Sequence, residues 1–300
     1  MRIGYFGDGV WAHEALRRIL GDSSLQVCFV CARYDTPDPV LKQLAKSANL
    51  PFLVTKNINS PEFIYQVKEM SCDIFVSMSF NQIFRGEILA IPPQRTINCH
   101  AGKLPFYRGR NILNWALIND EKEFGITVHY IDTGIDTGDI ILQQTYSISE
   151  SDDYRTLLEK AHVACPDILL KSIKLISAGG FCPKKQSELH PVGSYCSKRG
   201  VGDEILDWRQ TSRQIYNFIR AICRPGPIAR TYIHGSQSEV KINRAEMIPE
   251  ATPYIGVPGA VLGTGAGFFL VKTNDTLIKV IEWDSERTIK TGDRLCQKPS

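Results

Sequence analysis

Apolar positions in the first half of the chain follow two alternating patterns. Short apolar runs bounded by turn residues predict buried strands, and longer stretches with apolar residues three or four apart predict amphipathic helices. The strands are expected at 2–6, 25–32, 51–54, 72–78 and 96–99, and the helices at 10–20, 39–48 and 61–70. Because strands alternate with helices, we expect βαβ units and a Rossmann-like, mostly parallel sheet of α/β class.

The pattern changes after residue 110. A short helix is expected at 111–118, and two β-rich segments at 125–131 and 139–146 flank a turn rich in Gly and Asp. A long helix is expected at 153–176, after Ser and Asp residues that are suited to cap it.

Gly, Pro, Ser and Lys dominate residues 181–202, where the periodic pattern ends, and this composition predicts a linker. A further helix is expected at 209–222. Short strands separated by Gly and Pro turns follow and are typical of a small OB-like barrel; they are expected at 229–234, 239–245, 259–262, 268–271 and 277–283. We therefore expect a catalytic domain at 1–180, the linker, and a small β-rich C-terminal domain at 203–300.

The overall composition is ordinary for a globular protein, with 43% hydrophobic and 22% charged residues and a formal net charge of +3. The charge is uneven, because residues 184–244 contain 11 Lys and Arg against 5 Asp and Glu, a net charge of +6. A basic segment favours polyanionic partners such as phosphates or RNA. A solvated surface with an excess of Arg explains the same count equally well.

The first residues lack the pattern of a signal peptide, and no apolar run approaches the roughly 18 residues that span a membrane. We therefore expect a cytoplasmic protein without a membrane partner, whose nine cysteines are reduced thiols. Cys28 and Cys31 lie three apart in a predicted strand, so their side chains point to opposite faces. No metal site is expected.

Two polar residues lie at the carboxyl end of the predicted strand 96–99, where open α/β sheets bind ligands. Asn98 and His100 are two apart on extended backbone and point to the same side. His can accept a proton near neutral pH, and an Asn amide can donate to the oxyanion that forms when a carbonyl is attacked. Asp136, from the turn 132–139, can orient the imidazole. Acyl transfer to an amine needs these three roles.

Each part of this constellation also has a structural explanation. A buried His beside an Asn is more often a satisfied part of the core. The turn 132–139 is superficially like a calcium loop, but it lacks the bidentate Glu at loop position 12. Taken separately, the parts indicate little about function.

The order and spacing of these motifs resemble the signature of the folate-dependent formyltransferases. Asn98-Cys-His100 is followed by Leu104-Pro-Phe-Tyr-Arg-Gly109, and Asp136-Thr-Gly-Asp-Ile begins 36 residues after the His. This family includes methionyl-tRNA formyltransferase, glycinamide ribonucleotide formyltransferase and the nucleotide-sugar N-formyltransferases. The resemblance is strong from 74 to 145, fair over the rest of the first 180 residues, and looser in the tail.

The resemblance implies that Asn98, His100 and Asp136 are catalytic and that 10-formyltetrahydrofolate is the formyl donor, with no metal. The amine attacks the formyl carbon, His100 accepts its proton, Asn98 donates to the oxyanion, and Asp136 holds the imidazole. The pterin is expected near two segments, whose residues are Ser79, Phe80, Asn81, Gln82 and Ile83 in one and Asp132, Gly134 and Asp139 in the other.

Three amine substrates compete within the family. Residues 103–115 are most similar to the enzymes that formylate 4-amino-4-deoxyarabinose on a uridine nucleotide, and to related enzymes of surface-glycan and lipopolysaccharide synthesis. The tRNA enzymes share a C-terminal barrel that can bind nucleic acid, but they usually insert a longer basic loop where this chain has the short, acidic 33–40. The purine-pathway enzyme normally ends near residue 200. We therefore predict a nucleotide-linked amino sugar as the substrate, with tRNA as the alternative that the basic stretch 184–244 favours.

A nucleotide sugar predicts contacts at a helix amino terminus after the first strand, which favours phosphate, and on the opposite rim. The expected contacts are Gly7, Asp8, Gly9, Trp11, Lys103, Arg110 and Asn111. Lys103 departs from the family pattern, because many members have Ser-x-Leu-Pro after the His; it either faces a substrate phosphate or is a solvated loop lysine. Arg110 and Asn111 serve equally well as residues that stabilise the fold. Sugar formyltransferases are frequently homodimers, but the tail contains no heptads.

Two other functional classes are also compatible with the sequence. Gly7-Asp-Gly9-Val-Trp-Ala12, with Asp35 after the second strand, fits the dinucleotide fingerprint of an NAD-dependent dehydrogenase. That interpretation leaves Asn98, His100 and Asp136 unexplained. A catalytically inactive binding module with the same fold is the other class, and the presence of all three residue types argues against it.

Overall fold

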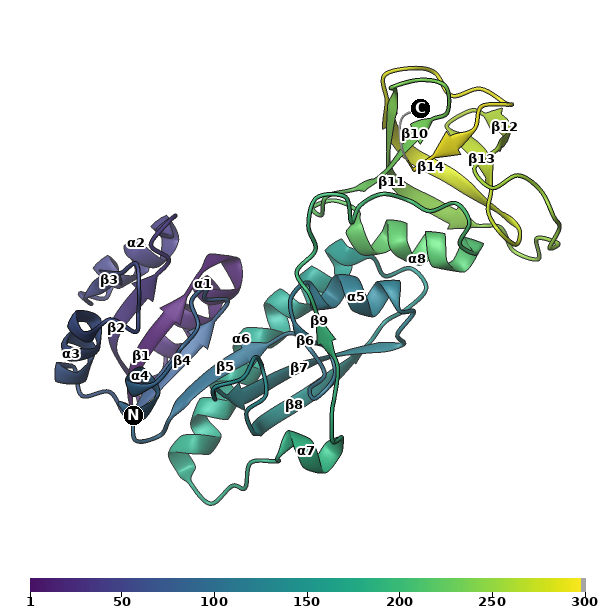
Figure 1. Ribbon diagram of the computed structural model, residues 1–300. Coiled ribbons are helices and arrows are strands. Elements are labelled where there is room, and N and C mark those ends of the chain that lie inside the picture. Colours follow the sequence, from purple (N-terminus) through teal and green to yellow (C-terminus); the bar gives the residue numbers. More distant parts are fainter. Residues whose placement is uncertain (298–300) are drawn as a thin grey trace. The chain divides into compact units, whose positions relative to one another are not determined.

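The computed structural model describes residues 1–297 and separates into two compact units (Figure 1). The first unit consists of Met1–Gly109, Phe124–Tyr146 and Glu159–Cys196. The second contains the rest, including the internal segments Arg110–Glu123 and Ser147–Leu158 together with the chain from Ser197 onward. The second unit thus includes residues from within the predicted catalytic domain. The domain boundaries remain a prediction.

The first unit is built on a sheet with the strand order β3-β2-β1-β4-β5-β7-β8. Pairing is parallel from β3 to β5, and β7 joins β5 in antiparallel sense. The predicted Rossmann-like, mostly parallel sheet is therefore confirmed. The strands are β1 (Arg2–Gly7), β2 (Gln26–Ala32), β3 (Phe52–Val54), β4 (Ile74–Met78), β5 (Thr96–His100), β7 (Glu123–Tyr130) and β8 (Ile140–Ser147).

Helix starts follow from local sequence. Asp38 accepts hydrogen bonds from the first turn of α2, Ser60 does so for α3, and each helix has Pro at its first position, where no donor is needed. No helix within residues 1–297 combines the length and apolar character needed to cross a bilayer. The helices are α1 (Gly9–Leu20), α2 (Pro39–Ser47), α3 (Pro61–Glu69), α4 (Glu87–Ala90), α5 (Ile112–Ile118), α6 (Tyr154–Ala178), α7 (Gln186–Leu189) and α8 (Ser212–Ile222).

One part of the sheet core is aromatic. Phe6 lies at its centre and contacts neighbouring rings mainly edge to face, with centroid distances of 5.3 Å to Phe29 and Phe75 and 4.9 Å to Phe84. Such pairs contribute roughly 0.5–1.5 kcal/mol each beyond the burial of their area. This packing holds β1, β2 and β4, whose carboxyl ends form one edge of the sheet.

The segment expected to be a linker, 181–202, contains ordered structure. Lys184 forms a bridge with Ile140, and a two-residue strand, β9 (Tyr195–Cys196), pairs in parallel with β6 (Arg108–Gly109). These elements, like α4 and α7, are too short to show a period in the sequence, so the sequence did not predict them. The segment nevertheless packs within the first unit as far as Cys196.

The second unit contains a curled antiparallel sheet with the order β12-β13-β14-β11-β10-β15. Beside the two end strands, Ala260 bridges Arg294, which closes the sheet on itself and leaves little free edge. The small β-rich C-terminal domain that we predicted is confirmed. Its strands are β10 (Ala229–Ile233), β11 (Glu239–Met247), β12 (Val261–Gly265), β13 (Phe268–Lys272), β14 (Leu277–Ser285) and β15 (Leu295–Cys296).

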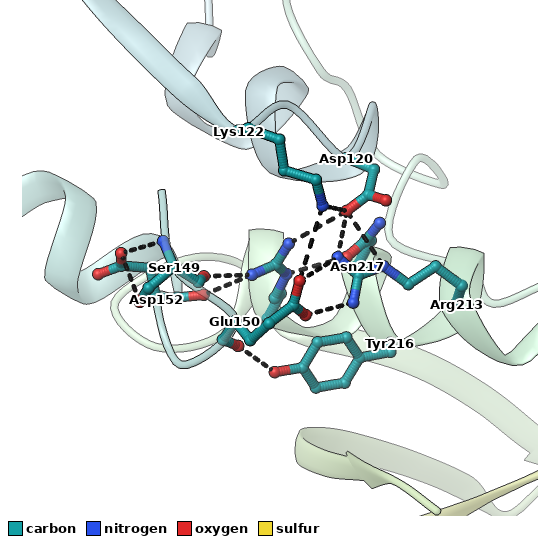
Figure 2. A network of polar contacts seen from close by, with 9 residues as sticks. Asp120, Lys122, Ser149, Glu150, Asp152, Arg213, Tyr216 and Asn217 are labelled. Carbon is teal, nitrogen blue, oxygen red and sulfur yellow. Dashed lines mark hydrogen bonds and ion pairs between the residues drawn. The ribbon is translucent and has the colours of Figure 1, made fainter. Parts of the chain in front are cut away.

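Charged side chains bind α8 to the two internal segments of the second unit (Figure 2). Arg213 Nε donates to Asp120 Oδ1 at 3.0 Å, and Nη2 of the same guanidinium donates to Glu150 Oε1 at 3.0 Å. The hydrogen bonds from Arg213 hold the pKa of Asp120 at about 2, so this carboxylate stays ionised at neutral pH. The segments that precede β7 and follow β8 are therefore tied to the C-terminal helix.

Arg220 is the buried member of this network, with 6% of its side chain exposed. Its Nη1 donates to the main-chain carbonyls of Ser149 and Asp152, each at 3.1 Å. Arg224, in contrast, is 52% exposed and pairs with carboxylates of β14. The two arginines lie four residues apart and offer a matched comparison of a buried and an exposed cation.

We expect Arg220→Ala to lower the free energy of unfolding by about 3 kcal/mol, because it removes a buried, charged donor that joins two main-chain carbonyls. Arg224→Ala, the control, should cost less than about 1 kcal/mol, because exposed ion pairs contribute little. Urea unfolding of both variants at pH 7 measures the difference. Equal losses in the two variants would contradict the assignment of Arg220 as the residue that holds these segments.

Candidate active site

His100, at the carboxyl end of β5, is buried and contacts two acceptor groups. Its Nε2 lies 2.7 Å from the carbonyl oxygen of Tyr107. Because a carbonyl only accepts, Nε2 donates in this arrangement. Its Nδ1 lies 3.6 Å from Asp136 Oδ2, beyond a direct hydrogen bond but close enough for a strong charge interaction in a buried site. The structure thus brings together the predicted imidazole and carboxylate.

Asp136 lies on the loop between β7 and β8 with a left-handed backbone, φ 54°. The N–H of Gly109 donates to its Oδ2 at 2.9 Å, and His129 Nε2 lies 3.5 Å from its Oδ1. Gly109 itself has φ 99°, and a Cβ there would collide with the carbonyl of Cys196. Burial acts to raise the pKa of Asp136, but His100, His129 and the Gly109 amide outweigh it and hold that pKa well below its usual range.

His129 is a fourth member of the site, and it was not predicted from the sequence. It lies on β7 directly opposite Asn98 in the antiparallel pairing and is 2% exposed. The amide nitrogen of Asn98 lies 3.4 Å from His129 Nε2, and Nδ1 donates to the carbonyl of Tyr130 at 2.8 Å. The only sequence signal was a single His within an apolar strand, which does not reveal its partner. His129 links Asn98 to Asp136.

The lowered pKa of His100 allows it to act as a general base at neutral pH. Burial lowers its pKa below the ordinary value, and the Asp136 carboxylate and the Tyr107 carbonyl offset this only in part. The imidazole is therefore neutral at pH 7 and available to accept a proton. Because Asp136 is ionised beside it, the site stabilises the imidazolium that proton uptake creates.

The loop after His100 is held by two side chains of the antiparallel strands. Thr127, opposite His100, donates to the carbonyl of Gly102 at 2.6 Å. The amide of Gln143 donates to the Leu104 carbonyl and to Thr127 Oγ1, each at 2.8 Å. A Cβ at Gly102 would collide with His100 Nε2, so only glycine fits there. Packing against the imidazole therefore explains the glycine two residues after His100.

The residues expected near the pterin divide into two groups. The ring of Phe80 packs against Phe6 at 5.6 Å, and the Gln82 amide accepts from Ile58 N at 2.9 Å and donates to Thr55 O at 2.8 Å. These two side chains support the fold. Exposed positions in the same segment are Ser79, Asn81 and Ile83.

Asp132, on the second expected segment, folds its own turn. Its Oδ1 accepts from Gly134 N at 3.0 Å and from Thr137 Oγ1 at 2.6 Å, and a Cβ at Gly134 would collide with that hydroxyl. The Asp139 carbonyl accepts from Tyr130 N at 2.9 Å, which closes the base of the loop. Folate contacts at both segments remain predictions.

The amino terminus of α1, where we expected a substrate phosphate, already holds a carboxylate. Gly9 N donates to Asp38 Oδ2 at 3.0 Å, and His13 Nε2 lies 2.7 Å from the same oxygen. Asp8 is paired with Arg33 at 3.2 Å. A phosphate would meet these carboxylates, so the geometry gives no support to an anion site at Gly7–Trp11. Trp11 packs edge-on against His162 at 4.6 Å.

The remaining expected contacts are less informative. Lys103 is half-buried, Arg110 is exposed, and Asn111 has a left-handed backbone and accepts from Arg199 N at 3.0 Å. Arg110 and Asn111 belong to the second unit, where Asn111 stabilises the fold. Substrate contacts at all three remain predictions. Within the described residues, no group of three or more His, Cys, Asp or Glu is placed to hold a metal ion.

Comparison with known proteins places these motifs in a family. The formyl transferase family model matches residues 8–173, and the model of the formyl transferase C-terminal domain matches residues 201–297. Methionyl-tRNA formyltransferase from Pelotomaculum thermopropionicum is 35% identical over 89% of this chain and 83% of that protein. The enzyme of the same name from Caldanaerobacter subterraneus subsp. tengcongensis is 31% identical over 98% of this chain and 95% of that protein.

Solved structures agree with the family. The sugar 3N-formyl transferase WlaRD, crystallised in the presence of dTDP and 5-N-formyl-THF, has a TM-score of 0.71 and 25% identity over 96% of this chain and 99% of that one. An N-formyltransferase from Helicobacter canadensis, in complex with folinic acid and dTDP-3-aminofucose, has the same TM-score and a similar fold at 23% identity, over 94% of this chain and 99% of that one. The dehydrogenase interpretation is set aside. The chain belongs to the formyl transferase family and is a folate-dependent N-formyltransferase.

Proposed function

We propose that this enzyme transfers the formyl group of 10-formyltetrahydrofolate to the amine of a nucleotide-linked amino sugar, in the cytoplasm and in the service of lipopolysaccharide or other surface-glycan synthesis. The observation that carries the choice of amine is the loop between β2 and α2. Its one cation, Arg33, is paired with Asp35 at 2.6 Å and Asp8 at 3.2 Å, and Asp38 follows. A tRNA backbone placed there would meet excess negative charge.

The basic stretch 184–244 supports a tRNA substrate less than its net charge suggests. Several of its arginines form ion pairs within the second unit, so their charges are compensated locally and the attraction for a distant phosphate is reduced. The acids that lie outside the stretch, and so compensate its net charge, are Asp120 and Glu150 beside Arg213 and Glu282 and Asp284 beside Arg224. The pairs of Arg209 with Asp207 and of Arg230 with Glu239 use acids already counted in the +6.

The proposed mechanism assigns one role to each group of the site. The amine nitrogen attacks the formyl carbon, the amide of Asn98 donates to the oxyanion, and the imidazole of His100 accepts the amine proton. The Asp136 carboxylate, 3.6 Å from His100 Nδ1, stabilises the imidazolium. The bond from the formyl carbon to N10 of the folate then breaks, and the imidazolium returns the proton to N10. His129 orients both Asn98 and Asp136.

The names of the most similar sequences favour a second candidate. Several relatives are called methionyl-tRNA formyltransferase, and this chain matches 77% to 100% of the length of each. On this alternative the amine is that of methionine esterified to initiator tRNA, and the C-terminal barrel binds nucleic acid. The site chemistry is the same, so only the amine distinguishes the two candidates.

We expect the purified chain to formylate a UDP- or dTDP-linked amino sugar with a kcat/KM at least about 100-fold above that for methionyl initiator tRNA, a difference of roughly 2.7 kcal/mol in transition-state binding. UDP or dTDP at 100 times its Kd should stabilise the fold by about 2.7 kcal/mol, and NAD should not. Formylation assays and thermal shift measure these effects. Efficient formylation of the tRNA with no turnover of any sugar nucleotide would favour the second candidate.

Substitution of the catalytic groups should abolish turnover without unfolding the chain. We expect His100→Ala and Asp136→Ala to lower kcat by about 100- to 10,000-fold. His100→Ala removes the proton acceptor, and Asp136→Ala removes the carboxylate that stabilises the imidazolium. Asn98→Ala should cost about 100- to 1,000-fold through loss of the oxyanion donor. His234→Ala, at an exposed position, is the control. Near-normal turnover in His100→Ala or Asp136→Ala would refute the mechanism, provided that circular dichroism shows a native fold.

The pH profile of kcat/KM should report the lowered pKa of His100. Because the neutral imidazole is the active form, activity should rise through a pKa below the ordinary value of about 6.5 and be level at pH 7. The Asp136 carboxylate raises the pKa of His100, so Asp136→Asn should move this acid limb to still lower pH while reducing the plateau. A limb that moves upward in Asp136→Asn would contradict the assignment.

A further inference from the structure

Residues 184–196, which we call the brace segment, contact both loops that carry the site. Lys184 and Ile140 exchange two main-chain hydrogen bonds of 2.8 Å, just after the Asp136 loop. Further along, Arg108 N donates to the Ser194 carbonyl at 3.0 Å, and β9 pairs with β6. The brace segment therefore crosses from the loop between β7 and β8 to the loop that follows His100.

Gln186 is the point where the two loops meet one side chain. It is 3% exposed. Its Nε2 donates to the carbonyls of Asp136 and Gly138, each at 2.8 Å. Its Oε1 accepts from Arg108 Nη2 at 2.7 Å and from Nε at 3.0 Å. Both donor hydrogens and both acceptor positions of the amide are thus used, which fixes its orientation.

The peptide that Gln186 binds has a demanding geometry. Asp136 has φ 54°, a left-handed conformation that costs non-glycine residues roughly 1–2 kcal/mol and persists only where surrounding contacts enforce it. The side chain of this residue carries the carboxylate that faces His100. Arg108, on the other side of the amide, directly precedes Gly109, whose N–H donates to the same carboxylate. Gln186 therefore binds Asp136 directly, and it also binds Arg108, the neighbour of the Gly109 amide that donates to the Asp136 carboxylate.

We propose that Gln186 is a positioning residue for formyl transfer, which fixes Asp136 and Gly109 relative to each other so that the carboxylate faces His100. The inference rests on the role proposed above for Asp136, and it goes beyond that role by assigning a function to a segment outside the sequence motifs. Gln186 does not contact the reacting atoms. Its effect passes through the position of the carboxylate, and a displacement of 1 Å in such a group can cost about 100-fold in rate.

Two variants separate positioning from a general loss of folding. Gln186→Met keeps the length of the side chain but has no amide. Gln186→Glu keeps one acceptor oxygen for Arg108 and replaces the donor Nε2 with a second oxygen, which lies against the carbonyls of Asp136 and Gly138. We expect both to lower kcat by about 10- to 100-fold with less than about a threefold change in KM, because the defect lies in the chemical step. Gln43→Met, at an exposed glutamine, is the matched control and should have wild-type kinetics.

A second readout needs no substrate. Titration of the His100 ring by NMR in the ligand-free protein reports the charges that face it, which are Asp136 on the loop after β7 and His129 on β7. Because the Asp136 carboxylate raises the pKa of His100, Asp136→Asn should move the titration to lower pH. Gln186→Met should move it in the same direction by a smaller amount, and Gln43→Met should leave it unchanged.

The two readouts make the inference falsifiable separately from the proposed function. Wild-type kcat in Gln186→Met and Gln186→Glu would overturn it. A loss of kcat with an unchanged His100 titration in Gln186→Met would also overturn it, since the residue would then act only on the fold. Failure of the wild type to formylate any amine tested would count against the proposed function alone, because the titration would still decide whether Gln186 positions Asp136.

Discussion

The contact of one buried carboxylate with two buried imidazoles is the constraint on which the site depends. Asp136 lies 3.6 Å from His100 and 3.5 Å from His129, and it stays ionised although burial opposes this. A carboxylate in such a place is stable only if hydrogen bonds and positive charge compensate the loss of water. Three features support this arrangement. They are the left-handed backbone of Asp136, the N–H of Gly109 that donates to its carboxylate, and the Gln186 amide that donates to its carbonyl.

The antiparallel pairing of β5 with β7 produces this arrangement from the sequence. It places Asn98 opposite His129 and His100 opposite Thr127, so that two polar pairs from distant segments meet at one edge of a largely apolar sheet. A shift of β7 by one residue would turn His129 and Thr127 to the opposite face and separate them from Asn98 and His100. The parallel strands beside them supply the buried, rigid support, and the site itself is completed by loops that those strands hold in place.

Hydrophobic patterns predicted the sheet, its helices and the β-rich C-terminal domain because each long element buries apolar residues, and burial leaves a pattern in the chain. Motif spacing predicted Asn98, His100 and Asp136 as catalytic, and the structure places His100 beside Asp136. His129 and Gln186 were not found, because their roles depend on partners 31 and 50 residues away, which no local pattern encodes. Composition predicted a linker at 181–202 but gave no sign of the side-chain and main-chain hydrogen bonds that order part of this segment. The helix terminus at Gly9 was expected to bind phosphate, but Asp38, 29 residues away, occupies it.

The same reasoning explains why net charge is a poor guide to the amine. Counted along the chain, residues 184–244 carry a net charge of +6, but the fold sets Asp120 and Glu150 against Arg213, and β14 carboxylates against Arg224. A phosphate responds to the field that remains after such pairing, not to the count. Enzymes of one family can therefore differ in substrate through loops and surface charge while the chemistry is kept, because the amine needs only to reach the imidazole. In the β2–α2 loop the fold likewise pairs Arg33 with Asp35 and Asp8, so the positive charge of this cation is compensated locally.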